Sequence, residues 1–201
     1  MTRLRVEKLT TDIFENLSFD ISGPGLYGLI GRNGIGKSTL FSLLNGEVKL
    51  SKGNFSVGKV CYVPSLDIFD KYLAANDYLK LLSPKEQTEF HKNLEIMGGA
   101  DFLTQKIGKY SLGMKELFTF VYVLSIRSDV LILDELLDGL DEQRRFTAYA
   151  LLRQCRKEKL ILLTSHNLSE VFDATDRVYI LEKTSLKVID DLATAQAQIS
   201  L

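Results

Sequence analysis

The spacing of apolar and polar positions divides the first fifty residues into strands, a glycine-rich turn and a helix. In residues 16–22 apolar side chains alternate with polar ones at period two, which predicts a strand with one buried face. Glycine and proline at 23–25 end that strand, and the short apolar run 26–30 predicts the next one. Leucines at helical spacing then predict a helix over residues 37–45.

The pattern changes to helical from about residue 66 to residue 127. Asn76, Ser83 and Ser111 stand just before apolar periodic segments, where a polar side chain is expected to cap a helix N-terminus. This part of the chain therefore predicts a helical insertion between two regions rich in strands.

Strands and helices alternate over the rest of the chain. Residues 130–133 and 160–163 are continuous apolar runs, which are typical of parallel strands buried on both faces. The further elements expected are helices 141–156 and about 168–174, and strands 177–182 and 186–190, which form a closing hairpin. Such alternation of strand and helix predicts an α/β fold with a mainly parallel sheet.

The composition fits one globular unit. The chain has 201 residues, of which 45% are hydrophobic and 25% charged, and no repeat or linker divides it. Its 25 basic and 26 acidic residues give a net charge of −1, which disfavours binding to nucleic acid. Cys61 and Cys155 are widely separated and lack metal-ligand spacing, so we expect free thiols in a reducing compartment.

Two segments bear on membranes and export. Residues 1–7 alternate charged and apolar side chains, which disfavours a signal peptide. The longest mostly apolar stretch, residues 117–126, is too short to cross a bilayer. We therefore expect a soluble protein, for which a membrane protein remains a possible partner.

A phosphate-binding motif joins the predicted strand 26–30 to the helix that follows. Gly31, Gly36, Lys37 and Ser38 satisfy G-x-x-x-x-G-K-[ST]. Glycines allow backbone amides to wrap a di- or triphosphate, Lys37 suits the β- and γ-phosphates, and the Ser38 hydroxyl suits Mg²⁺. The flanking elements disfavour the alternative, an ordinary glycine turn. By contrast, the G-x-G-x-x-G pattern at residues 23–28 precedes a strand and contains proline, which favours a turn over a dinucleotide site.

Further candidates stand at the carboxyl ends of predicted buried strands. Asp134 and Glu135 follow the run 130–133, where Asp134 suits Mg²⁺ and Glu135 suits the polarisation of an attacking water. His166 follows the strand 160–164 and suits a contact with a γ-phosphate. Taken alone, Asp134 and Glu135 are most simply interpreted as two solvated acids at a strand end, and His166 as a surface or capping residue. Together with the phosphate loop, the two acids indicate nucleotide hydrolysis.

The order of these motifs resembles the nucleotide-binding domain of an ABC ATPase. It runs from the phosphate loop through Ser111-Leu112-Gly113-Met114-Lys115 to Asp134-Glu135, Gly139-Leu140-Asp141 and Ser165-His166. The resemblance covers essentially the whole chain. It implies a P-loop NTPase fold with a mainly parallel sheet core, an N-terminal antiparallel β part and an inserted helical subdomain. The boundaries are a single domain 1–201, with a catalytic core of about 1–65 and 128–201 and a helical subdomain of about 66–127.

The resemblance also implies site residues, cofactors and partners. The nucleotide would be ATP with Mg²⁺, shared between two subunits packed head to tail, either two copies of this chain or this chain and a homologous subunit. Ser111 and Gly113 would reach the ATP of the other subunit, and Asp141 would couple the two sites. The remaining roles are catalysis for Glu135, His166 and Lys37, metal binding for Ser38, Asp134 and, less directly, Ser65, and ATP binding for Gly31, Asn33, Gly34, Gly36, Lys37, Ser38 and Thr39.

The sequence departs from the family pattern at three places. Ser65 stands where the family has a glutamine that contacts Mg²⁺, so we expect looser or water-bridged metal coordination. Leu136-Leu137 replaces the usual Pro-Thr after the glutamate. The position of the usual adenine-stacking aromatic holds none, and the nearest aromatic residue, Phe14, is expected in the core.

The function expected from this resemblance is that of an ATPase subunit of an ABC transporter. It would work in the cytoplasm, on the inner face of the cell membrane, bound to a separately encoded permease. The wording of residues 111–115 is similar to ATPases of multidrug, bacitracin and lantibiotic resistance exporters, which favours export. Phe69, Tyr72 and Tyr78 within residues 66–82 suit permease docking, with core burial of some equally open.

Two other functions remain alternatives at this point. One is a catalytically weak partner in an asymmetric ATPase pair, for which Ser65 is the support. The other is an ABC protein acting on DNA or ribosomes, which is disfavoured because the chain has neither a long coiled coil nor a second cassette. A GTPase is disfavoured because no Asn-Lys-x-Asp motif is present.

Overall fold

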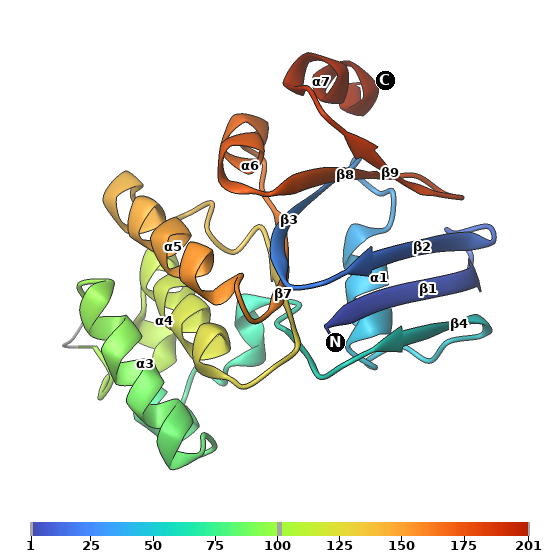
Figure 1. The fold of residues 1–201 in the computed structure, drawn as a ribbon. Coiled ribbons are helices and arrows are strands. Elements are labelled where there is room, and N and C mark those ends of the chain that lie inside the picture. The colour runs from blue at the N-terminus through green and yellow to red at the C-terminus, as the bar shows by residue number, and fades with distance from the viewer. Residues whose placement is uncertain (1, 100–101, 201) are drawn as a thin grey trace.

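The computed structural model describes residues 2–99 and 102–200. Its centre is a six-stranded sheet with the order β5-β6-β7-β3-β8-β9 (Figure 1). Neighbouring strands from β5 to β8 run parallel, and β9 runs antiparallel to β8. The strands are β3 (Gly25–Ile30), β5 (Val60–Tyr62), β6 (Val130–Asp134), β7 (Leu160–Thr164), β8 (Arg177–Leu181) and β9 (Leu186–Ile189).

A second sheet lies to one side of the first. It contains β1 (Arg3–Thr10), β2 (Leu17–Ser22) and β4 (Lys52–Val57), which pair antiparallel in the order β2-β1-β4. Leu4 and Val6 alternate with exposed charged residues, so one face of β1 is buried. The expected N-terminal antiparallel part and mainly parallel core are both confirmed.

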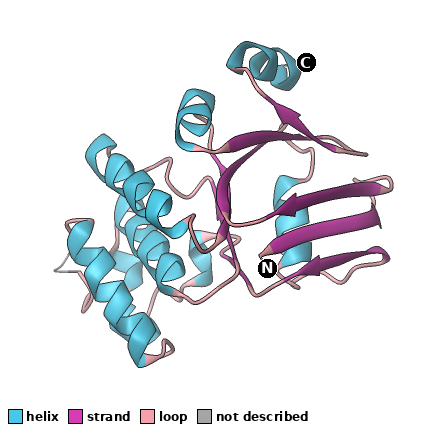
Figure 2. Cartoon of the chain, in the orientation of Figure 1, coloured by secondary structure: helices cyan, strands magenta, loops and turns pink. Residues whose placement is uncertain are grey.

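Helices surround the two sheets. Figure 2 shows α3, α4 and α5 gathered on one side of the large sheet, whereas α1 lies on the side of the antiparallel sheet. The helices are α1 (Lys37–Leu44), α2 (Ala75–Leu79), α3 (Pro84–Ile96), α4 (Leu112–Ser125), α5 (Glu142–Cys155), α6 (Leu168–Ala174) and α7 (Leu192–Ser200), with 3₁₀ turns at Leu66–Ile68 and Ile107–Lys109. No helix in the described part of the chain has both the length and the apolar character that crossing a membrane requires.

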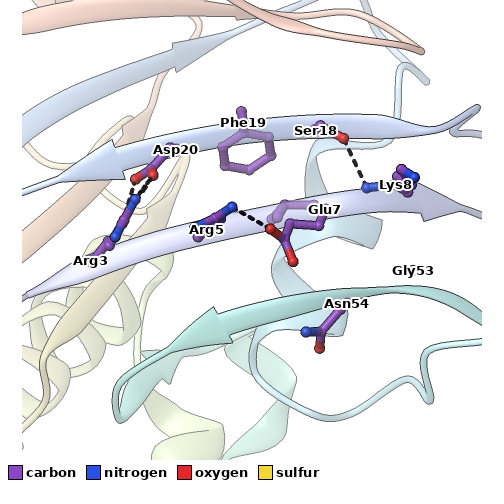
Figure 3. Close-up of a pocket in the computed structure, with 10 residues that line it drawn as sticks. Arg3, Arg5, Glu7, Lys8, Ser18, Phe19, Asp20, Gly53 and Asn54 are labelled. Carbon is purple, nitrogen blue, oxygen red and sulfur yellow. Dashed lines mark hydrogen bonds and ion pairs between the residues drawn. The ribbon is translucent and has the colours of Figure 1, made fainter.

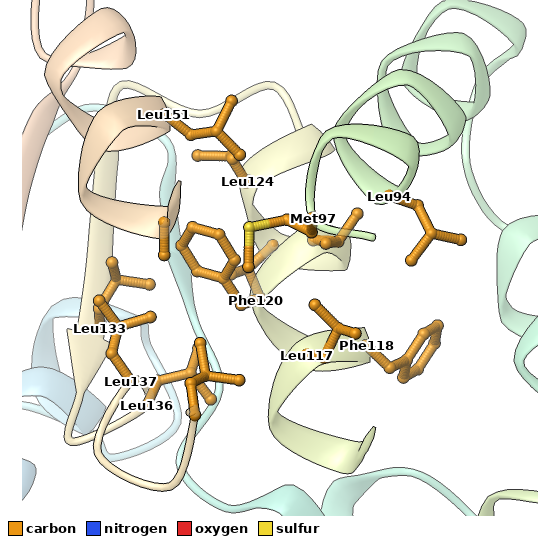
Figure 4. Packing of buried hydrophobic residues seen from close by; sticks show 14 of the residues in the cluster. Leu94, Met97, Leu117, Phe118, Phe120, Leu124, Leu133, Leu136, Leu137 and Leu151 are labelled. Atoms are coloured by element: carbon orange, nitrogen blue, oxygen red, sulfur yellow. The ribbon is translucent and has the colours of Figure 1, made fainter. Parts of the chain in front are cut away.

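The apolar run in β6 serves two separate cores. Leu131 and Leu133 face a cluster built with α2–α5, part of which is drawn in Figure 4. Val130 and Ile132 face a cluster built with α1 and the antiparallel sheet. Successive side chains of a strand point to opposite faces, so burial on both faces requires a continuous apolar run.

Two of the three predicted helix caps are confirmed. Ser83 accepts a hydrogen bond from the Glu86 amide and begins α3, and Ser111 accepts one from the Met114 amide and begins α4. The prediction for Asn76 is wrong, because α2 begins at Ala75 and its N-cap position is Ala74. The Ala74 amide there donates to the Asp77 carboxylate, which supplies a polar partner from inside the helix.

An aromatic cluster holds the 3₁₀ turn against α4. The Phe69 ring packs edge-on against Tyr78, Phe118 and Tyr122, with centroid distances of 5.0, 5.0 and 5.7 Å. Phe69 is 8% exposed, so of the two places that the sequence left open for it, interface or core, it lies in the core. Tyr72, in contrast, is 68% exposed.

Candidate functional site

The phosphate loop connects β3 to α1. Gly34 and Gly36 have φ values of 77° and 103°, a region that side chains with a Cβ rarely adopt. A Cβ on Gly36 would also lie 2.8 Å from Cζ of Phe14. Phe14 is fully buried, as predicted, and supports the loop from below.

Lys37 occupies the first position of α1 and turns back over the loop. Its Nζ donates to the Gly31 carbonyl at 3.0 Å. Beside it lies a cavity of about 170 Å³ between the loop and the carboxyl ends of β6 and β7. The residues around the cavity are Leu29, Ile30, Gly31, Asn33, Lys37, Glu135, Thr164, Ser165, His166, Leu168 and Ile199. Five of the residues predicted to act in catalysis or nucleotide binding therefore line one cavity: Gly31, Asn33, Lys37, Glu135 and His166.

Asp134 is the centre of a hydrogen-bond network at the end of β6. Its Oδ2 accepts from the Ser38 hydroxyl at 2.8 Å and from the Tyr62 hydroxyl at 3.3 Å, and its Oδ1 accepts from the Thr164 hydroxyl at 2.7 Å. Burial, followed by the neighbouring Asp134 charge, raises the pKa of Tyr62, so its hydroxyl stays protonated and donates. Tyr62 and Thr164 could not be recognised from the sequence, because their roles depend on the pairing of β5 with β6 and of β6 with β7.

Glu135 and His166 form a contact across the ends of β6 and β7. His166 Nε2 lies 3.1 Å from Glu135 Oε2, and the side chains are 70% and 42% exposed. Glu135 has a φ of 55°, which is uncommon for a residue other than glycine. Its amide donates to the Thr164 hydroxyl at 2.9 Å, which ties this strained residue to β7.

Ser65 lies after β5 and stabilises the turn that follows it. Its hydroxyl oxygen accepts from the Asp67 amide at 3.2 Å and caps the 3₁₀ turn Leu66–Ile68. In this segment of the chain, the hydroxyl that contacts Asp134 belongs to Tyr62.

Ser111, Gly113 and Asp141 stand outside the residues that line the cavity. Ser111 is an exposed cap of α4, and its hydroxyl oxygen accepts from the Met114 amide at 3.2 Å. Asp141 is the corresponding cap of α5 and accepts from the Arg144 amide at 2.9 Å. The structure thus gives both residues a capping role within one chain.

A larger hollow, of about 780 Å³, lies on the face of the antiparallel sheet (Figure 3). Four of its charged side chains form two ion pairs, Arg3 with Asp20 and Arg5 with Glu7. The Arg3 hydrogen bond lowers the pKa of Asp20 to about 2. The sequence motifs and the strand ends converge instead on the smaller cavity beside Lys37, which we take as the candidate site.

Comparison with known proteins agrees with the geometry. A family model described as ABC transporter matches residues 14–138, which is more than half of the chain. The chain belongs to this family. As an ABC transporter ATP-binding subunit, it binds ATP and is an ATPase whose hydrolysis is coupled to transport.

The relatives of this ABC subunit differ in direction of transport. It is 30% identical over 185 residues to the O-antigen export system ATP-binding protein RfbB of Klebsiella pneumoniae, covering 87% of this chain and 75% of that protein. It is 31% identical over 177 residues to the zinc import ATP-binding protein ZnuC 1 of Aliivibrio fischeri, covering 85% and 69%.

A solved structure shares the fold of this ABC subunit. It is described as that of the ATP-binding subunit of an ABC transporter and superposes with a TM-score of 0.85 at 22% sequence identity. The match covers 100% of this chain and 95% of the other. The predicted α/β P-loop fold is therefore confirmed, whereas the individual site residues stay predictions.

Proposed function

We propose that this ABC subunit hydrolyses ATP at sites shared between two subunits packed head to tail, and that it drives a membrane permease that exports its cargo. The observation that carries the hydrolysis is the convergence of Lys37, Glu135 and His166 on one cavity, next to the Ser38–Asp134 contact. Open α/β sheets bind ligands at this edge, where their strands end.

The loop between β3 and α1 binds the phosphates in this proposal. Backbone amides around Gly34 and Gly36 face them, the N-terminus of α1 adds partial positive charge, and Lys37 adds a full one. The proposed ATP-binding residues are Gly31, Asn33, Gly34, Gly36, Lys37, Ser38 and Thr39.

Ser38 and Asp134 fit the requirements of Mg²⁺. A hydroxyl and a carboxylate 2.8 Å apart offer the oxygen donors that Mg²⁺ prefers, and the phosphates and water supply the remaining ligands of such sites. Mg²⁺ neutralises phosphate charge when it is bound. Ser65 contributes at most through water, since its hydroxyl caps a turn.

Glu135 and His166 line the cavity from the ends of β6 and β7 and perform the hydrolytic step in this proposal. The Glu135 carboxylate orients the attacking water and accepts its proton, and the His166 imidazole holds that carboxylate while contacting the γ-phosphate. The half-exposed Glu135 and the exposed His166 leave this position open to solvent in one chain, which suits completion by a second subunit.

Ser111, Gly113 and Asp141 belong to the shared interface in this proposal. Ser111 caps the exposed N-terminus of α4, where a hydroxyl and backbone amides are donors for the γ-phosphate bound by the other subunit. Asp141 begins α5 in the loop that follows the Glu135 strand, so it links the two sites. The second subunit is another copy of this chain or a homologous one.

The permease docks on the helical part of the chain, about residues 66–127, while residues 1–65 and 128–201 form the catalytic core. Support comes from exposed apolar side chains on neighbouring segments: Ile68, Tyr72, Leu73 and Leu81 are 56%, 68%, 42% and 75% exposed. This docking would hold the subunit in the cytoplasm at the inner face of the membrane.

Export is supported by the resemblance of residues 111–115 to resistance exporters.

A catalytically weak partner in an asymmetric pair is a second candidate. The observation that favours it is Ser65, whose hydroxyl caps a turn where the family places a longer amide side chain. The contact between Glu135 and His166 favours the active form instead.

ATP hydrolysis by the purified subunit tests the proposal. Glu135→Gln and His166→Ala should each lower kcat at least about a hundredfold, since both groups act in the transition state, while nucleotide binding is retained. Glu158→Gln and His91→Ala alter exposed residues of the same types and should leave kcat unchanged. If Glu135→Gln and His166→Ala both hydrolyse ATP as fast as the wild type, the proposal is contradicted.

A further inference from the structure

The loop after Glu135 is anchored in the core at two consecutive positions. Leu136 and Leu137 are 8% and 0% exposed and pack in the cluster shown in Figure 4. The loop ends where Asp141 caps α5. Asp138 lies between Leu137 and Asp141 in this loop.

Asp138 uses both oxygens of its carboxylate on the turn that follows β7. Oδ1 accepts from the Ser165 hydroxyl at 2.6 Å, and Oδ2 accepts from the His166 amide at 3.0 Å. A carboxylate is an acceptor with two oxygens, so it matches two adjacent donors without leaving either unpaired. Hydrogen bonds to a charged acceptor are also the stronger kind.

The same turn is held from its other end. The Ser165 hydroxyl oxygen accepts from the Asn167 amide at 3.0 Å, and Asn167 in turn caps α6 by accepting from the Glu170 amide. Residues 165–167 therefore connect the loop after β6 to the start of α6. The backbone of His166 sits in the middle of this connection.

The exposure of His166 makes this backbone anchoring important. Its side chain is 70% exposed, so packing does not fix the imidazole that lies 3.1 Å from Glu135 Oε2. The direction of an exposed side chain depends on the backbone that carries it. In the described structure, that backbone is bonded to Asp138.

We propose that Asp138 is a positioning residue that holds the Ser165-His166 turn so that the His166 imidazole meets the Glu135 carboxylate. The inference rests on the proposed roles of Glu135 and His166. Asp138 itself does not line the cavity, so it acts through His166 and not on the nucleotide. The loop that carries Asp138 also leads to Asp141, which belongs to the proposed subunit interface.

Steady-state kinetics of the full chain give the first part of the test. Asp138→Ala should lower kcat about tenfold, with KM for ATP changed less than about twofold, because misplacing a catalytic group affects the transition state more than binding. Asp138→Asn should recover most of kcat, since its amide accepts from the His166 amide and donates to Ser165. Asp173→Ala, an exposed carboxylate on α6, is the matched control with no expected effect.

Histidine NMR gives the second part. The chain has two histidines, so the ring signals of His166 and His91 are resolved by His91→Ala. Asp138→Ala should shift or broaden the His166 signal and leave the His91 signal in place, and Asp138→Asn should restore it. If Asp138→Ala does not fold, Ser165→Ala and Asp138→Asn are measured instead, with a moved His166 signal and a lower kcat expected for Ser165→Ala.

The outcomes separate this inference from the proposed function. Unchanged kcat in Asp138→Ala, or a lower kcat with an unmoved His166 signal, would overturn the positioning role; in the fallback set, the same results for Ser165→Ala would do so. Normal kcat in His166→Ala would instead overturn the proposed role of the histidine itself.

Discussion

Ser38 Oγ lies 2.8 Å from Asp134 Oδ2, although the two residues are 96 positions apart in the chain. The contact joins the first turn of α1 to the last residue of β6. It exists because β3 and β6 both pair in parallel with β7, so their carboxyl ends reach the same edge of the sheet. The two halves of the proposed metal site therefore come together through sheet topology.

This contact predicts the metal dependence of the enzyme. Ser38→Ala should raise the Mg²⁺ concentration that gives half-maximal ATP hydrolysis about tenfold, and Asp134→Asn should raise it further, because each removes an oxygen donor. The measurement is a Mg²⁺ titration of hydrolysis, with nucleotide binding in the presence of Mg²⁺ as a second readout. Ser42→Ala, on the same helix, should titrate like the wild type. Identical titrations for all variants would contradict the proposed metal site.

A substitution at Ser65 should change the Mg²⁺ dependence in the opposite direction. Its side chain is short and its hydroxyl oxygen already accepts from the Asp67 amide, so we expect loose or water-bridged coordination. Ser65→Gln should lower the half-maximal Mg²⁺ concentration about threefold, since a longer amide side chain extends toward the metal. An unchanged titration and an unchanged turnover in Ser65→Gln would count against loose coordination.

Glu116 predicts a pH dependence of stability. The side chain is buried in the first turns of α4, and its Oε2 has no hydrogen-bond partner among the described residues. Burial, followed by the charge of Asp138, raises the pKa of Glu116, while the Gly139 amide lowers it less. As pH rises above the pKa of an unfolded glutamate, the unfolded chain loses this proton first, so stability falls until the folded pKa is passed.

Glu116→Gln should remove the loss of folding stability that occurs as pH rises. The variant should raise Tm by a few degrees at pH 8 and by less at pH 4, where the carboxyl is mostly protonated in both states. Glu95→Gln, an exposed residue on α3, should show no such pH-dependent gain. A Tm difference between Glu116→Gln and the wild type that is equal at both pH values would refute the assignment.

Phe69 and Tyr72 differ in burial, so their substitution should have different effects on stability. Phe69→Ala should lower the free energy of unfolding by about 3–5 kcal/mol, because it leaves a cavity among three aromatic rings. Tyr72→Ala, at an exposed position, should change it by less than about 0.5 kcal/mol. Chemical denaturation measures both.

Copurification with the permease then tests the docking role of the same surface. Tyr72→Ala, combined with Leu81→Ala, should weaken the complex without loss of stability. Undiminished copurification of this double variant would argue against docking at the exposed apolar residues.

Much of the fold could be predicted from local pattern. Buried parallel strands such as β6 and β7 need apolar residues on both faces, and that requirement is visible as a continuous run. Several elements were not predicted with bounds, among them β4, β5 and α7. β5 has three residues, β4 is mostly exposed and contains glycine, and α7 has an alanine-rich, weakly periodic sequence.

The candidate site was predictable only where a motif fixes the chemistry. The phosphate loop and the pair Asp134-Glu135 carry a recognisable spacing beside a strand. Tyr62, Thr164 and Asp138 carry none, because their contacts arise from the pairing of strands and from a loop that returns to the end of β7. The sequence left Phe69 open between interface and core, because an aromatic residue between charges looks the same in sequence whether it is buried or exposed.

ATP-dependent mass, measured by light scattering after size exclusion, tests the central claim of shared ATP sites most directly. Glu135→Gln slows hydrolysis and should trap the sandwich, so its mass should double from that of one 22.7 kDa chain when ATP and Mg²⁺ are present. Ser111→Arg in the same background should restore the monomer while ATP binding persists. A dimer indifferent to Ser111→Arg would contradict the account, and a Glu135→Gln variant that binds ATP and remains monomeric would contradict a site shared between two copies of this chain.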